Sequence, residues 1–143
     1  MSIIKKASAH WEGDLKSGIG SISTETNVLN KAPYGFKARF EGGKGTNPEE
    51  LIAAAHAGCF SMALSAGLGK AGFEPVRIKT QALLDLDNVE GSWRITTIRL
   101  ETVARIPKIT PSQFETIAQD AKANCPVSQV LKANITLVAK LED

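Results

Sequence analysis

The sequence has little cysteine, few aromatic residues and little net charge. Two cysteines occur among 143 residues, 6% of the residues are aromatic, and 17 basic side chains against 15 acidic ones leave a formal net charge of +2. So small an imbalance argues against a surface that follows nucleic-acid phosphates or binds an anionic membrane. We therefore expect no nucleic-acid partner.

Residues 1–20 do not contain the apolar region of a secretory signal, and the sequence has no strongly apolar run. Charged residues occur throughout positions 1–20, so we expect the protein to stay in the cytoplasm. Residues 51–69 carry no formal charge, but Ala, Gly and Ser dominate them and His56 lies near their middle. Because such a segment gains little free energy in lipid, we interpret it as a helix buried inside protein and expect no membrane partner.

The length and the order of the predicted elements indicate one domain, residues 1–143, of the α+β class. Alternating and β-branched residues predict strands, and apolar residues three and four apart predict helices. In chain order we expect strands 3–11, 20–28 and 35–41, a helix from 48 to about 68, strands 75–87 and 92–107, a helix from 110, and a strand 133–141. These elements predict a mostly antiparallel sheet with a long, central, buried helix.

Local signals fix the helix boundaries. Asn47 is typical of a residue that caps a helix N-terminus, and Pro48 is typical of the first helical position. In the second predicted helix the apolar spacing turns Cys125 toward the core, and Pro126 is expected to break the helix directly after it.

Two predicted strands have informative patterns. In the third, alternation places Phe36 and Phe40 on one face and Arg39 on the other. In strand 92–107, the apolar phase shifts by one residue before Ile98, which predicts a β-bulge.

The two cysteines allow several interpretations. A reducing compartment argues against a permanent disulfide and leaves packed thiols, a metal site or a redox pair. Packed thiols are common, because free cysteine is among the most buried residue types. A zinc-binding structural module could use Cys59, Cys125 and His56, since His56 precedes Cys59 by one helical turn.

A reactive Cys59 would need a cation beside it. Its neighbours along the chain are apolar, and desolvation raises the pKa of a thiol, whereas the thiolate is the attacking form. Arg39 suits this role better than His56, because a guanidinium stays charged when partly buried and pairs with a carboxylate through two hydrogen bonds. Glu49 or Glu50 could supply that carboxylate.

Five segments together resemble the OsmC branch of the OsmC and organic hydroperoxide resistance superfamily. They are residues 11–14, 34–42, 45–51, 57–64 and 124–128. The resemblance covers essentially the whole chain. One departure is Gly58, where relatives commonly have alanine.

This resemblance implies a thiol peroxidase that reduces organic hydroperoxides, and hydrogen peroxide more weakly, to alcohols in oxidative and osmotic stress defence. It makes Cys59 the attacking cysteine, Cys125 the resolving cysteine, Arg39 the activating arginine and Glu49 its acidic partner. Cys59 would become a sulfenic acid and then form a disulfide with Cys125, which a dithiol reductant of the lipoyl type would reopen. No metal, flavin or haem cofactor is implied.

Helix geometry and the resemblance both predict a homodimer. Glu49 and Cys59 lie ten residues apart on one predicted helix, or ~15 Å along its axis. If Glu49 serves the Cys59 site, the second copy must supply it, so we expect an intertwined homodimer with active sites at the interface.

The tail of a hydroperoxide needs an apolar pocket near the thiol. The candidate lining residues are Phe36, Phe40, Phe60, Met62 and Phe73.

Overall fold

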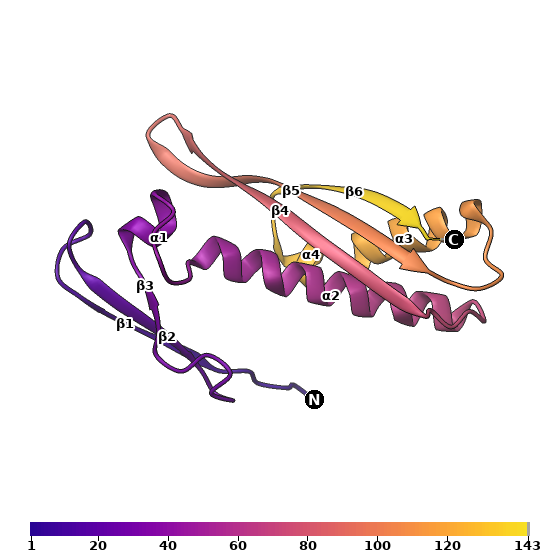
Figure 1. Ribbon diagram of the computed structural model, residues 1–143, viewed down its shortest axis with the longest axis horizontal. Helices are drawn as coiled ribbons and strands as arrows, with labels where there is room; N and C mark the ends of the chain where they lie inside the picture. The colour runs from indigo at the N-terminus through magenta and orange to yellow at the C-terminus, as the bar shows by residue number, and fades with distance from the viewer. Residues whose placement is uncertain (143) are drawn as a thin grey trace. The chain divides into compact units, whose positions relative to one another are not determined.

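Residues 1–142, which the computed structural model describes, form two three-stranded sheets and four helices (Figure 1). The chain divides into two compact units, Met1–Leu51 and Ile52–Asp143. Helix α2 (Pro48–Lys70) begins in the first unit and continues through the second without a break. The α+β class predicted from the sequence is confirmed.

The first unit contains an antiparallel sheet in the order β1-β2-β3. Its strands are β1 (Ala7–Glu12), β2 (Ile19–Thr24) and β3 (Ala32–Tyr34). Ala38 is the only residue of this unit that is buried. The sheet therefore has almost no hydrophobic core within its own unit.

The prediction of a strand over residues 35–41 is wrong, because Phe36–Phe40 form the short helix α1. Residues four apart share a face in a helix as well as in a strand, so the pattern of Phe36 and Phe40 could not separate the two. Their rings lie 5.1 Å apart, and the Arg39 guanidinium lies 5.1 Å from the Phe40 ring centre. Arg39 therefore does not face away from the phenylalanines.

The predicted start of α2 is confirmed. The Asn47 side-chain oxygen accepts a 2.7 Å hydrogen bond from the backbone N–H of Glu50, and Pro48 is the first helical residue. These contacts satisfy or remove N–H groups that a helix leaves free at its N-terminus.

Only one face of α2 is buried. His56, Phe60, Leu64 and Leu68 recur at every fourth position and are fully buried. The opposite side, which we name the exposed face of α2, consists of Ala54, Ala55, Gly58, Met62, Ser65, Ala66 and Gly69. The expectation of a buried helix thus holds for one face within a single chain.

The second unit contains a sheet in the order β4-β5-β6. Strands β4 (Arg77–Val89) and β5 (Ser92–Arg105) form an antiparallel hairpin, and β6 (Asn134–Leu141) lies parallel to β5. The predicted bulge is confirmed, because Asp85 pairs with Thr97 and Leu86 pairs with Ile95. Thr96 is the extra residue between them.

Two helices precede β6. Helix α3 (Pro111–Asn124) starts with a capping box, in which Thr110 and Gln113 bond each other's backbone N–H groups. Helix α4 (Pro126–Val130) follows at once, so the predicted break at Pro126 is confirmed. Cys125 caps α4 and is 1% exposed, which confirms its predicted core position.

The core of the second unit joins α2, the sheet and α3. Full burial of one large apolar side chain contributes about 1.5–3 kcal/mol, so this cluster supplies much of the stability. The buried residues are Phe60, Leu64, Leu68, Ile98, Leu100, Ala104, Ile106, Phe114, Ala118, Ala121 and Cys125.

Among residues 1–142, α2 is the one helix long and apolar enough to cross a membrane by length and composition. A core helix of a soluble protein passes the same test. Because Phe60, Leu64 and Leu68 pack into the core, we interpret α2 as a core helix.

Candidate active site

The two cysteines meet at the contact between α2 and α4. Cys59 lies on α2 and is partly exposed, whereas Cys125 is buried at the start of α4. Both are free thiols, and Cys59 packs against the buried cluster that contains Cys125. The fold therefore brings together two sulfur atoms that lie 66 positions apart in the sequence.

The surroundings of Cys59 disfavour its thiolate. Burial raises the pKa of this thiol, and the hydrogen bond and charge of Cys125 raise it further. The backbone N–H of Val127, in the first turn of α4, acts in the opposite direction and lowers the pKa, but the net shift is upward. A reactive thiolate at Cys59 thus requires an additional cation.

Arg39 and Glu49 form a bidentate ion pair in the first unit. Nε and Nη2 of Arg39 each donate a hydrogen bond of 2.9 Å to one carboxylate oxygen of Glu49. The Arg39 side chain remains 35% exposed, so its guanidinium has donors left for another group, whereas Glu49 is 12% exposed. Glu49, rather than Glu50, supplies the carboxylate, because Glu50 instead accepts a hydrogen bond from Thr46.

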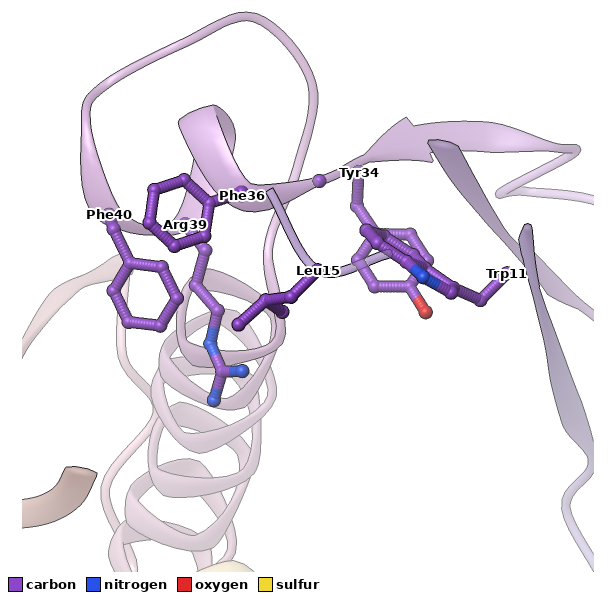
Figure 2. Close-up of a pocket in the computed structure, with 7 residues that line it drawn as sticks. Trp11, Leu15, Tyr34, Phe36, Arg39 and Phe40 are labelled. Atoms are coloured by element: carbon purple, nitrogen blue, oxygen red, sulfur yellow. The ribbon is translucent and has the colours of Figure 1, made fainter. Parts of the chain in front are cut away.

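An apolar cavity of about 290 Å³ lies beside Arg39. Figure 2 shows the Arg39 side chain extending between the Phe40 ring and Leu15. Trp11 and Tyr34 form another part of the wall, with their rings 5.5 Å apart. The cavity thus combines an apolar lining with one cationic group.

Two of the five predicted pocket residues, Phe36 and Phe40, line this cavity. Of the others, Phe60 is buried in the core of the second unit, Phe73 packs against that core, and Met62 is 77% exposed.

The sequence reasoning missed Trp11, Leu15 and Tyr34 as lining residues. Trp11 and Tyr34 lie in segments that carry the family resemblance, and that signal could have identified them. Leu15, in the turn after β1, gave no such signal.

The geometry does not support a zinc site. His56 faces Ser128, with 2.7 Å between its Nε2 and the Ser128 Oγ. Within residues 1–142, no three or more His, Cys, Asp or Glu side chains are grouped so that they could hold a metal ion. Cys59, Cys125 and His56 therefore do not form the ligand set that the zinc alternative requires.

Comparison with known proteins gives consistent matches. The family model described as OsmC-like protein matches residues 41–140. The chain is 60% identical over 142 residues to Peroxiredoxin OsmC of Escherichia coli (strain K12), with 99% of each chain covered.

Solved structures show the same fold. An OsmC-like protein of unknown function from Vibrio cholerae superposes with a TM-score of 0.78 at 15% sequence identity, covering 96% of this chain and 99% of that chain. The organic hydroperoxide resistance protein OhrB of Bacillus subtilis superposes with a TM-score of 0.65 at 25% identity, covering 96% and 98%.

Proposed function

The chain belongs to the OsmC family of peroxidases, and we propose that it reduces organic hydroperoxides, and hydrogen peroxide more weakly, through the thiol of Cys59. The packing of Cys59 against the cluster that contains Cys125 carries this proposal, because a two-cysteine peroxidase needs thiols that can bond. The names of relatives from Bacillus subtilis and Xanthomonas, organic hydroperoxide resistance proteins, favour organic substrates and a role in stress defence.

The chemistry needs two steps at sulfur. The Cys59 thiolate attacks the outer peroxide oxygen, the O–O bond breaks, and the leaving alkoxide takes a proton to become an alcohol. Cys59 is then a sulfenic acid. Cys125 attacks its sulfur, the S–O bond breaks, and water leaves with formation of the Cys59–Cys125 disulfide.

Arg39 is the cation that we assign to the Cys59 thiolate. Glu49 holds the guanidinium of Arg39 through the bidentate pair. Because the arginine side chain is already ordered, it loses less conformational entropy when it binds a negatively charged sulfur. Glu49 and Cys59 are ten residues apart on the continuous helix α2, ~15 Å along its axis. A carboxylate cannot span that separation, so we assign the pair to the Cys59 of a second copy.

The assembly that meets this requirement is an intertwined homodimer with antiparallel α2 helices. The exposed face of α2 carries small residues such as Ala54 and Ala66, which permit close approach of a second helix, and an exposed Met62. The first unit buries only Ala38 and leaves Leu15, Ile19 and Val28 exposed, so it too would gain from a partner surface. In such a dimer residues 1–143 act as one domain.

The cavity beside Arg39 would hold the alkyl or aryl tail of the substrate. Its aromatic and aliphatic walls match an apolar tail, and the guanidinium at its side would face the polar peroxide group. A dithiol, such as a protein-bound or free lipoyl group, would attack the disulfide and regenerate both thiols. No metal or organic cofactor is needed for these steps, and a cytoplasmic location fits two cysteines that must be reduced in every cycle.

Turnover of cumene hydroperoxide with dihydrolipoamide tests this proposal. We expect the wild-type protein to turn over and Cys59→Ser to be inactive. Cys125→Ser should react once and accumulate a sulfenic acid at Cys59, detected by trapping with dimedone and mass spectrometry. Wild-type thiols that remain unchanged after exposure to peroxide would instead support inert packed cysteines.

A further inference from the structure

The proposed chemistry leaves one buried titratable side chain without a role. His56 lies on the core face of α2 and is 0% exposed. Its Nε2 lies 2.7 Å from the Ser128 Oγ on α4, and its Nδ1 is buried without a hydrogen-bond partner among residues 1–142. An unpartnered buried nitrogen costs free energy, so an imidazole at this position calls for an explanation beyond filling space.

Ser128 continues the contact from His56 to the resolving cysteine. Its Oγ lies 3.2 Å from the Sγ of Cys125, and its backbone N–H donates to the same sulfur at 3.4 Å. Ser128 is itself buried, so bulk water does not compete for these bonds. A continuous chain of polar contacts thus joins Cys125 Sγ, Ser128 Oγ and His56 Nε2.

The direction of proton transfer along these contacts follows from the protonation state of the imidazole. Burial lowers the pKa of His56, so the ring is neutral at neutral pH and one ring nitrogen has a free lone pair that accepts a hydrogen bond. With Nε2 as the acceptor, the Ser128 hydroxyl donates to His56 and its oxygen can accept from the Cys125 thiol. A thiol must lose its proton before it attacks a sulfenic acid, because the thiolate is the nucleophile.

We propose that Ser128 and His56 form a buried proton relay for the resolving cysteine. The inference rests on the proposed function, since it assumes that Cys125 attacks an oxidised Cys59. Ser128 touches a reacting atom and is a catalytic residue, whereas His56 acts through Ser128 and is a positioning residue that also receives the proton.

The relay removes the proton of Cys125 in two linked transfers. The Cys125 thiol proton moves to Ser128 Oγ while the Ser128 hydroxyl proton moves to His56 Nε2. The Cys125 electron pair forms the S–S bond to Cys59, and the S–O bond of the sulfenic acid breaks. The departing hydroxide becomes water when the proton held by His56 passes back through the Ser128 hydroxyl, so the step needs no net exchange of protons with solvent.

The two chemical steps can be measured separately in a single turnover. Reduced protein is mixed with cumene hydroperoxide, and quenched samples are analysed by mass spectrometry for sulfenic acid and for disulfide. In Ser128→Ala we expect sulfenic acid formation at Cys59 within about 2-fold of the wild-type rate. Disulfide closure should slow by about 10-fold to 100-fold, which is typical of a lost hydrogen bond to a charged group or of a lost proton acceptor.

Conservative variants separate a relay from a structural contact. Ser128→Thr keeps the hydroxyl and should close within about 3-fold of the wild-type rate. His56→Gln keeps a group that can hydrogen-bond Ser128 but cannot accept the proton, so disulfide closure should slow by about 100-fold. Ser61→Ala is the matched control, because that hydroxyl bonds Ala57 and Thr80 rather than a cysteine.

Two results would overturn the relay. One is disulfide closure at the wild-type rate in either Ser128→Ala or His56→Gln. The other is an equal slowing of sulfenic acid formation and disulfide closure. If Ser128→Ala does not fold, as judged by circular dichroism, the His56→Gln result decides. Failure of the wild-type protein to form any sulfenic acid at Cys59 would instead refute the proposed function itself.

Discussion

Arg39 and Glu49 meet through two parallel hydrogen bonds of 2.9 Å that join α1 to the first turn of α2. The contact fixes the plane of the guanidinium, because its Nε and Nη2 atoms are both hydrogen-bonded. It also leaves the charge partly exposed, at 35% of the side chain. A fixed and accessible cation is what a thiolate with an otherwise raised pKa requires.

Replacing this cation with one of different shape should impair peroxide reduction. Arg39→Lys keeps the charge but loses the two-pronged pairing, so we expect kcat/KM for cumene hydroperoxide to fall by about 10-fold to 100-fold. The pKa of Cys59 should rise, measured from the pH dependence of alkylation by iodoacetamide. Arg77→Lys is the control, because Arg77 forms a similar pair with Glu142 at 2.8 and 2.9 Å in the second unit. Equal losses in both variants would count against the role of Arg39.

Acid should destabilise the fold through His56. Burial lowers its pKa from the usual 6.5, so just below pH 6.5 the unfolded state binds more protons than the folded state. The stability due to the neutral imidazole is therefore present above pH 6.5 and is lost as the pH falls toward the folded pKa. The free energy of unfolding, measured with urea, should fall less in His56→Gln than in wild type as the pH is lowered from about 7.5 to about 5.

A substitution that changes no ionisable group provides the control for this measurement. Ser61→Ala, on the same helix as His56, should retain the wild-type decline in stability. A decline that is the same in wild type and His56→Gln would show that another group is responsible.

A charge on the exposed face of α2 should separate the proposed dimer. Met62 is 77% exposed in the single chain, and burying an unpaired carboxylate there against a second helix would be strongly unfavourable. We expect Met62→Glu to sediment as a monomer and to lose peroxidase activity, because in the proposed dimer each site combines residues of both chains. Val130→Glu alters a residue that is 75% exposed but lies on α4, and it should remain dimeric. A dimeric Met62→Glu variant would contradict the antiparallel pairing of α2.

Alanine at position 58 should stabilise the protein. Gly58 lies inside α2, and a Cβ built there meets nothing within 4 Å. Because glycine is less favourable than alanine in a helix interior, Gly58→Ala should raise the free energy of unfolding by about 1 kcal/mol. Gly67→Ala should gain less, since its Cβ would lie 3.0 Å from Cγ2 of Ile117. Thermal or urea unfolding of both variants measures the difference, and a destabilised Gly58→Ala would indicate a close contact at this position.

The sequence anticipated features that depend on neighbours along the chain. The Asn47 cap, the Pro126 break and the bulge before Ile98 each follow from backbone chemistry within a few residues, and the structure contains all three. The strand prediction for residues 35–41 was wrong because so short a segment does not distinguish a period of two from a period of 3.6.

The amino-acid sequence by itself determined the family, and it supplied the residues to which we assign the chemistry: two thiols, an arginine and a carboxylate. Tertiary structure decided which of them meet. His56 and Ser128 lie 72 residues apart, and only the packing of α4 against α2 places that hydroxyl between an imidazole and Cys125. The physical reason is that burial and hydrogen bonding across such a distance depend on the whole core, and no local pattern encodes them.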